Sequence, residues 1–256
     1  MVPPVTAHPL ARRPRFLLAG LLSAGLVAGL TACGGGGEQD PDAGTNGVGK
    51  LSAKKIQSRT VKAAQAADTV HVSGSVVVGG RTYRLDMRLK DDGGTGSVTT
   101  KDGTFQLLRV GEHLFLKASA AFWTHSDEGK NAHEGGTAAE KLDGKYVKVP
   151  SGDPAYKQLS TFTDKEVLLD GLLTLHGTLA KGDRGAADGV RTIELSGDKG
   201  AGGTLDVSLE GTAYPLRLER AGGAGSLKLT EWGKGFELRE PDDADTVDYG
   251  QALPAS

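Results

Sequence analysis

Apolar and polar residues alternate most clearly along 81–90, a stretch with the sequence RTYRLDMRLK. This period of two predicts a β-strand with one buried and one solvated face. Its apolar positions are Tyr83, Leu85, Met87 and Leu89. The stretch 69–78 precedes it across the dipeptide Gly79-Gly80, which suits a two-residue hairpin turn because the central residues of such a turn need positive φ. The two stretches are therefore predicted to form a hairpin.

Glycine-containing turns divide much of the remaining chain into further short apolar stretches. Turns at 92–94, 102–103 and 110–112 continue the hairpin into a meander, and Pro150 ends a short strand at 145–150. Four more strands are predicted in the C-terminal third, at 189–197, 203–211, 213–221 and 225–233. In all, about ten strands are expected from these signals.

Two segments have the three- and four-residue spacing of amphipathic helices. The first is 51–67, with Ser52 as its expected N-cap. The second is 163–180, where Thr163 and Glu166 have the spacing of a capping box. Leucines recur along this second segment at Leu168, Leu172, Leu175 and Leu179. Each helix therefore has an apolar stripe that needs a partner surface.

The strand pattern indicates an antiparallel sheet that is solvated on one face, because the predicted strands alternate apolar with polar positions. The helices are then needed to cover the other face. A sheet of about ten strands also twists and curls. We therefore predict an α+β fold: a strongly curved antiparallel β-sheet, or half-barrel, with two or more helices packed across its concave face.

The N-terminal part of the chain has a different pattern. Residues 16–30 form an uncharged apolar run, preceded by Arg12, Arg13 and Arg15 and followed by the only cysteine of the chain, Cys33. A basic start, a short apolar run and small residues after it describe a secretory signal. As a helix the run would span about 22 Å, less than the ~30 Å of a hydrocarbon core, so a transmembrane helix is the weaker interpretation. The paired arginines leave both Sec and Tat export open.

The sequence Leu-Thr-Ala-Cys that ends at Cys33 resembles the lipobox of bacterial lipoproteins. That resemblance implies cleavage before Cys33 and attachment of diacylglycerol to its sulfur, the strongest nucleophile among protein side chains. The glycine- and aspartate-rich segment 33–49 is expected to be a flexible tether. The predicted organisation is a lipoprotein signal peptide at 1–32, the tether at 33–49, and one domain at 50–256.

The charge balance limits the possible partners. The chain has 30 Lys and Arg against 32 Asp and Glu, a net charge of −2, and loss of the three arginines in the signal would change it to −5. This argues against nucleic acid as a partner; the membrane contact is expected to come from the lipid on Cys33. Gly44, Gly49 and Lys50 have P-loop spacing, but Leu51 occupies the position that requires Ser or Thr, so no nucleotide site is predicted.

Five features follow one another along the chain: the box at Cys33, the helix at 50–67, the stretches 105–123 and 144–150, and the leucine-rich helix from Thr163. Together they resemble the LppX/LprAFG lipoprotein family of actinobacteria, over nearly all of the chain after Cys33. The resemblance implies a half-barrel with helices in its concavity, where some members hold acylated lipids or glycolipids for transport across the envelope. It also implies a lipid-anchored position on the extracytoplasmic face of the cell membrane.

A lipid carrier of this kind would use apolar residues between helices and sheet to line its cavity. The candidate pocket residues are Leu85, Met87, Phe122, Trp123, Leu168, Leu172 and Leu175. Since a helix stripe that faces a sheet is also ordinary core, plain packing stays open for each. The predicted function is a membrane-anchored lipoprotein that binds or carries an acylated lipid or glycolipid. The alternative is a cell-envelope lipoprotein with a protein-interaction or structural role and no lipid ligand.

Catalytic and metal chemistry have little support in the sequence. His125, Asp127, Glu128, His133 and Glu134 gather in one polar loop, but they lack the helical spacing that orients metal-binding imidazoles. A solvated loop is predicted there, with no metal and no cofactor. The sequence contains no Gly-x-Ser-x-Gly nucleophile motif, and no enzyme activity is predicted.

Overall fold

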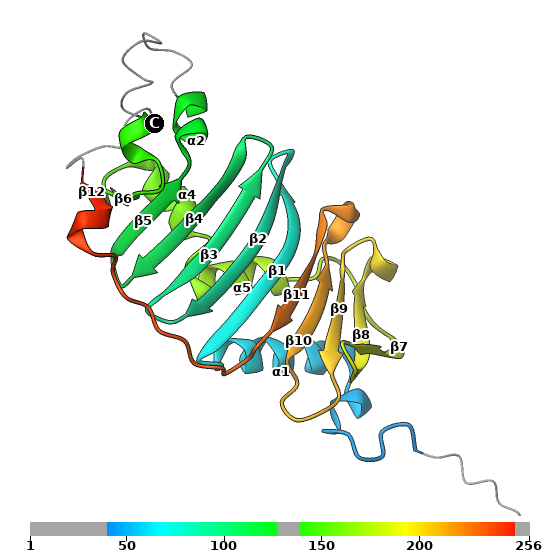
Figure 1. Ribbon diagram of the computed structural model, residues 1–256. Helices are drawn as coiled ribbons and strands as arrows, with labels where there is room; N and C mark the ends of the chain where they lie inside the picture. Colours follow the sequence, from blue (N-terminus) through cyan, green and yellow to red (C-terminus); the bar gives the residue numbers. More distant parts are fainter. Residues whose placement is uncertain (1–39, 127–138, 249–256) are drawn as a thin grey trace, which may run out of the picture. The chain divides into compact units, whose positions relative to one another are not determined.

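The computed structural model describes residues 40–126 and 139–248, which form an α+β fold with one large sheet and few helices (Figure 1). The helices are α1 (Ala53–Gln65), α2 (Ala120–Ser126), α4 (Pro154–Ser160) and α5 (Lys165–Leu173). The strands are β1 (Thr69–Val78), β2 (Arg81–Lys90), β3 (Gly93–Thr100), β4 (Gly103–Val110), β5 (His113–Ala118), β6 (Tyr146–Val149), β7 (Leu179–Ala187), β8 (Val190–Gly197), β9 (Thr204–Ser208), β10 (Pro215–Glu219), β11 (Gly225–Thr230) and β12 (Thr246–Asp248). Four short 3-10 helices are η1 (Val48–Lys50), η2 (Asp198–Gly200), η3 (Ala221–Gly223) and η4 (Asp243–Asp245).

The twelve strands of the described residues belong to one sheet, in the order β12-β6-β5-β4-β3-β2-β1-β11-β10-β9-β8-β7. The meander β1–β5 and the meander β7–β11 join through β1 and β11, where His71 lies opposite Thr230. Neighbours run antiparallel except β12, which pairs with β6 in parallel. The chain reaches this edge by way of 231–245, which contains no strand (Figure 1). The antiparallel sheet is thus confirmed, with one parallel pair at its edge.

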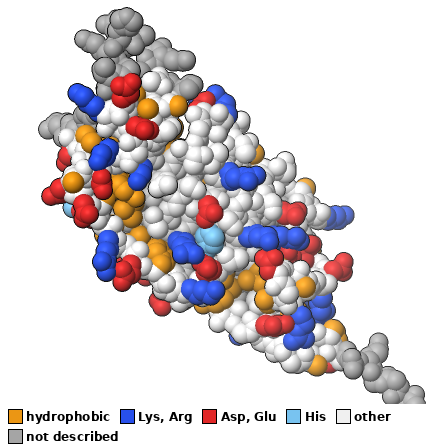
Figure 2. Space-filling view, in the orientation of Figure 1, with side chains coloured by type: hydrophobic (Ala, Val, Ile, Leu, Met, Phe, Trp, Pro, Cys, Tyr) orange, Lys and Arg blue, Asp and Glu red, His pale blue; other side chains and the backbone are white. Residues whose placement is uncertain are grey.

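One contiguous hydrophobic core occupies the face of the sheet on which α1, α4 and α5 lie (Figure 1). Both meanders contribute to it, for example through Val72 and Leu85 from the first and Leu195 and Leu205 from the second, each at most 1% exposed. The opposite face carries Lys, Arg, Asp and Glu side chains scattered among uncharged surface (Figure 2). This is the division into one buried and one solvated face that the alternation predicts.

The predicted hairpin at 69–90 is confirmed. β1 and β2 pair over their full length, with Thr69 opposite Lys90 and Val78 opposite Arg81. Gly79 and Gly80 form the turn with φ of 58° and 74°, a conformation that side chains with a Cβ rarely adopt. The helix predicted at 51–67 is α1, and Ser52 occupies its N-cap position, although its side chain makes no capping hydrogen bond.

The predicted leucine-rich helix at 163–180 is shorter than expected and is capped by a different residue. Helix α5 begins after Asp164, whose side chain accepts from the Val167 amide, so the capping box with Thr163 is wrong. Leu175 lies beyond the end of the helix, and Leu179 begins β7. The spacing of these two leucines follows a helical period only by coincidence, because strand pairing with β8 determines the conformation of the chain from residue 179 onward.

Two short helices and two strands were not predicted. Helix α4 begins with an Asp-Pro signal: Asp153 accepts from the Ala155 amide, and Pro154 occupies the first turn, where its missing N–H costs nothing. Strand β7 lacks alternation, since most of its side chains are exposed at the edge of the sheet and its register shifts between Lys181 and Arg184. Strand β12 has only three residues, too few to show a period.

Residues 40–49, which the sequence analysis places in the tether, pack against the second meander. Asn46 donates from its amide nitrogen to the Ser208 carbonyl at 3.0 Å and from its backbone to the Leu209 carbonyl at 2.8 Å. Val48 is fully buried in the core, and Asp42 forms an ion pair of 2.7 Å with Arg184. These contacts give the segment defined partners on the sheet from residue 40 onward. Cys33 and the signal at 1–32 lie outside the described residues.

Candidate functional site

Helix α5 and the residues directly after it carry three of the seven candidate pocket residues. Leu168 and Leu172 are 9% and 5% exposed, and Leu175, just beyond the helix, is 8% exposed. Val167, on the other side of the helix, is 53% exposed. The helix therefore presents a leucine face to the core and an open face to solvent.

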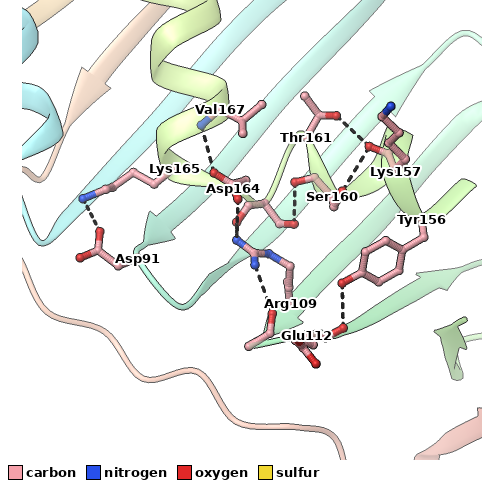
Figure 3. A network of polar contacts seen from close by, with 12 residues as sticks. Asp91, Arg109, Glu112, Tyr156, Lys157, Ser160, Thr161, Asp164, Lys165 and Val167 are labelled. Atoms are coloured by element: carbon pink, nitrogen blue, oxygen red, sulfur yellow. Dashed lines mark hydrogen bonds and ion pairs between the residues drawn. The ribbon is translucent and has the colours of Figure 1, made fainter. Parts of the chain in front are cut away.

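The N-terminal end of α5 is fastened to β4 by Arg109 (Figure 3). Its guanidinium donates to the Thr163 carbonyl at 3.0 Å and to the Asp164 carboxylate at 3.4 Å, while its other terminal nitrogen donates to the Gly111 carbonyl at 3.1 Å. The Arg109 side chain is only 13% exposed, on the face of β4 that also presents Leu107 to the core. One buried cation thus holds both the helix start and its capping residue.

Lys165 fastens the same end of α5 to helix α1. Its side chain is 1% exposed, and its ammonium donates to the backbone carbonyls of Ala67 and, at 3.3 Å, Gln65. It also lies 2.5 Å from the Asp91 carboxylate, which is 76% exposed (Figure 3). Carbonyls at the end of a helix have no intrahelical partner and attract cations. Lys165 therefore supplies the C-terminus of α1 with the hydrogen bonds that its own backbone cannot make.

The C-terminal end of α5 is held by fewer contacts. The Gln57 amide of α1 donates to the Leu173 carbonyl at 3.1 Å, and Arg220, after β10, donates to the Gly171 carbonyl at 3.2 Å. Thr174 then leaves the helix in an extended conformation, with φ of −79° and ψ of 107°. The two ends of α5 consequently differ. At the N-terminal end, the largely buried Lys165 and Arg109 each contact several acceptors, whereas Gln57 and Arg220 hold the C-terminal end with one hydrogen bond each.

A hollow of about 50 Å³ lies at this second end, between α5, strand β10 and the loop that precedes β9. Its lining includes Leu172, Leu175, Leu218, Ala224, His176 and Arg220. Gly202 and Gly203 form part of the wall, and a Cβ at Gly202 would lie 1.9 Å from the His176 carbonyl oxygen. The glycines thus let the loop before β9 approach the end of α5 closely, and they leave an apolar hollow with a polar rim.

Of the seven candidate pocket residues, only Leu172 and Leu175 line this hollow. Leu85 and Met87 lie in the core on β2, 1% and 0% exposed, and Trp123 is 5% exposed on α2. Phe122 packs against Phe105 of β4, with ring centroids 5.3 Å apart. All seven therefore belong to the apolar layer between helices and sheet. The assignment of a ligand pocket to them stays a prediction.

The charged residues around α5 were missed by sequence reasoning. Lys165 carried a usable signal, because a lysine in the first turn of a helix opposes the helix dipole and needs a partner elsewhere. Arg109 and Arg220 carried a weaker signal, since alternation places them on the apolar side of their strands, with Leu107 and Leu218, but a charged residue at a strand end can turn toward solvent. Only the chain path shows that both guanidinium groups turn toward α5.

The polar face of the sheet has its own hollows. One of about 140 Å³ lies beside His71, whose ring forms a 2.7 Å contact with Asp86, and beside Arg88, which pairs with Glu231 at 3.0 Å. A wider, open one of about 480 Å³ lies over β1–β3 and is lined mainly by serine and threonine with Arg84. These hollows are polar, whereas the one at α5 has an apolar floor.

Burial raises the pKa of Glu194, on β8, above its usual value. The nearby carboxylates of Asp206, Asp183 and Glu219 add to this increase, while Arg217 opposes it. A carboxyl group with a raised pKa in the folded state binds its proton more tightly there than in the unfolded chain. Its ionisation therefore destabilises the fold as pH rises above about 4.5.

Glu194→Gln is expected to stabilise the protein at pH 7 and to have no such effect near pH 4. The gain should be below about 1 kcal/mol because the site is partly solvated, which corresponds to at most about 2–4 °C in melting temperature. Thermal unfolding at both pH values measures it, with Glu237→Gln, at a side chain that is 78% exposed, as the control. A stabilisation equal at both pH values would contradict the electrostatic explanation.

Within residues 40–126 and 139–248, no three His, Cys, Asp or Glu side chains come together as possible metal ligands. Asp127, Glu128, His133 and Glu134 of the polar loop lie outside the described residues, as does the side chain of His125. None of the described helices has the length and apolar character required to cross a membrane.

No family model and no curated protein sequence matches this chain. Solved structures are similar to it. LprF from Mycobacterium bovis has 17% sequence identity and a TM-score of 0.49, over 74% of this chain and 96% of that one. The lipoprotein LppX from Mycobacterium tuberculosis has 17% identity and a TM-score of 0.44, over 73% and 100%. A LolA superfamily protein from Nitrosomonas europaea has 11% identity and a TM-score of 0.24, over 76% and 96%. The sequence analysis predicted a resemblance to the first two of these groups, and the structural similarity to LprF and LppX is found at low sequence identity.

Proposed function

We propose that this chain is an extracytoplasmic lipoprotein, held to the cell membrane by a diacylglycerol group on Cys33, that binds or carries an acylated lipid or glycolipid. The observation that carries the proposal is the apolar layer between the helices and the sheet, which opens at the end of α5 into a hollow with an apolar floor. An acyl chain needs a continuous apolar surface, and this layer extends across both meanders.

The proposed binding mode requires α5 to move. A hollow of about 50 Å³ is far smaller than the ~150 Å³ apolar cavity that admits benzene in an engineered protein. An acyl chain would therefore enter as the C-terminal end of α5 separates from β10 and the loop before β9, while Lys165 and Arg109 keep the other end in place. In this proposal the sheet acts as a half-barrel, with the helices across its concave face.

The proposed organisation follows from the same features. A signal peptide at 1–32 directs export, cleavage leaves Cys33 as the lipidated N-terminus, and the tether ends before residue 40, where contacts with the rest of the domain begin: Asp40 pairs with Lys50, and Asp42 with Arg184 of the sheet. The domain would thus start at about residue 40 rather than 50. Binding rather than catalysis is the proposed role, with the membrane reached through the lipid on Cys33.

A second candidate is a cell-envelope lipoprotein that binds another protein and has no lipid ligand. The observation in its favour is that Leu85, Met87 and Leu172 are at most 5% exposed within one packed core. The larger hollows, such as that over β1–β3, are polar and open to solvent. A filled core with a polar groove on the opposite face suits recognition of a polar surface.

The substitution Cys33→Ser tests the covalent lipid anchor separately from noncovalent lipid binding. The variant is expected to leave the membrane fraction completely and to lack the covalent lipid, because a hydroxyl is a far weaker nucleophile than a thiolate. Noncovalently bound lipid should still be extracted from the purified variant and identified by mass spectrometry. The unaltered chain is the control. An unchanged membrane fraction would contradict the anchor, and an extract free of lipid from both forms would favour the second candidate.

A further inference from the structure

We propose that the hollow at the C-terminal end of α5 is the mouth of the lipid site and that Arg220 binds an anionic headgroup there. This inference rests on the proposed lipid-binding function and adds to it a class of ligand: amphiphiles with a carboxylate or phosphate next to the acyl chain. Three observations carry it, namely the polarity of the hollow, the direction of the charges at its rim, and the way α5 is held.

The floor of the hollow is apolar and its rim is polar. Leu172 and Leu175 from the α5 side meet Leu218 of β10, with Ala221 and Ala224 closing the far side. Arg220 and the exposed His176 lie at the rim. An amphiphile has the same division, and a site that accepts its acyl end at Leu172 would place its polar end beside Arg220.

The charges at the rim are arranged for an anion. Side chains alternate across a strand, so Arg220 extends the face of Leu218, toward α5, whereas Glu219 extends the face of Arg217. The Glu219 carboxylate acts on Glu194, which is paired in register with Asp206 on the polar face. Glu219 also belongs to the lining of the hollow, but its exposed carboxylate acts on Glu194 and is therefore directed toward the polar face of the sheet.

Among the described residues the Arg220 guanidinium forms no ion pair, and its side chain makes one hydrogen bond, to the neutral Gly171 carbonyl. The arginines within β10 and β8 differ: Arg217 pairs with Asp206 and Arg191 with Glu210, each at 2.9 Å. A guanidinium has five N–H donors and matches carboxylate or phosphate oxygens in a bidentate manner. The guanidinium of Arg220 therefore has only a neutral acceptor, which an anionic ligand can replace.

The hydrogen bond from Arg220 to the Gly171 carbonyl connects headgroup binding with the movement of α5 that opens the hollow. Arg220 and Gln57 hold the C-terminal end of α5 through one hydrogen bond each, whereas the other end is held by buried Lys165 and Arg109. An anion competes with the Gly171 carbonyl for Arg220, because hydrogen bonds to an ionised acceptor are the stronger ones. Binding of the headgroup would therefore release the end of α5 that must move to admit the chain.

The test uses the purified full chain and two fluorescent probes, dansyl-undecanoic acid and its uncharged methyl ester. Arg220→Gln should weaken binding of the acid about tenfold, the loss expected for one charge-assisted hydrogen bond, and leave the ester unchanged. Arg220→Lys should retain most of the affinity for the acid. Arg217→Gln, at a β10 residue three positions earlier and on the opposite face, is the matched control and should bind both probes like the unaltered chain.

The outcomes are distinguishable. Equal affinities of the unaltered chain and Arg220→Gln for the acid would overturn the headgroup assignment while lipid binding stands. Equal weakening by Arg217→Gln would show a general charge effect and would also overturn it. If the unaltered chain binds neither probe, the proposed function fails together with this inference. Circular dichroism of each variant shows whether a loss of binding comes from a loss of fold.

Discussion

Replacement of Lys165 by Met is expected to lower the free energy of unfolding by about 2–4 kcal/mol. The Lys165 ammonium is 1% exposed and donates to the carbonyls of Gln65 and Ala67 at the end of α1. A thioether of similar length fills the same space but donates nothing, so both carbonyls are left without this partner, at about 1–3 kcal/mol for each buried group that stays unsatisfied. Unfolding in urea, with the slope of the transition compared, measures the change.

Asp91→Asn is the matched control for this substitution. Asp91 lies 2.5 Å from the ammonium but is 76% exposed, so its loss should cost below about 1 kcal/mol. If Lys165→Met costs no more than Asp91→Asn, the helix carbonyls do not depend on Lys165, and the proposed fixed end of α5 loses its main support. Because Met keeps the volume, a large loss cannot be assigned to a cavity.

Replacement of Leu172 by Ala is expected to cost about 2–5 kcal/mol, the usual loss when buried methyl groups are removed from a packed core. Leu172 is 5% exposed and belongs to the contiguous core. It also borders the hollow of about 50 Å³, which should hold part of a larger side chain. Leu172→Trp is therefore expected to cost less than Leu172→Ala and, at the same time, to abolish binding of dansyl-undecanoic acid.

Leu195→Trp is the control for the larger side chain. Leu195 is fully buried on β8 and does not line the hollow, so an indole there should overpack the core at about 1–3 kcal/mol. Urea unfolding and probe titration of the three variants give both readouts. A Leu172→Trp variant as unstable as Leu195→Trp, from a chain that binds no probe, would contradict the lipid site and favour the protein-binding candidate.

Local sequence patterns predicted those parts of the fold in which a segment's own pattern favours the same conformation as its packing in the sheet. The alternation in 81–90 and the Gly79-Gly80 turn predict the β1–β2 hairpin, because a period of two with positive φ at the turn has few other solutions. The four strands in the C-terminal third have the same origin, and they appear as β8–β11. In β11, for example, Leu227 and Leu229 are buried while Ser226 and Lys228 are exposed, so the sequence itself records the two faces.

The end of α5 shows why the rest was not predictable. Leu175 and Leu179 continue the helical spacing, but the His176 amide donates to the Gly202 carbonyl and Gly177 has φ of 79°, so the chain turns out of the helix. These partners lie more than twenty residues away in the sequence and leave no local signal. The edge strand β7 is similar: most of its side chains are exposed, so it has no alternation to detect, and pairing with β8 places it in the sheet.

The amino-acid sequence by itself determined the α+β class, the antiparallel strands and the set of leucines that enters the core, and the lipidation of Cys33 stays a prediction from it. These properties depend on composition and on periods of two or of three to four residues, which neighbours in the chain establish. Only the tertiary structure decided that Lys165 and Arg109 fasten one end of α5, that Arg220 faces the other, and that a hollow lies beside it. Each of these contacts joins strands and helices that are far apart in the chain. Backbone carbonyls without a local partner accept hydrogen bonds from distant side chains there, and local preference does not record which side chains these are.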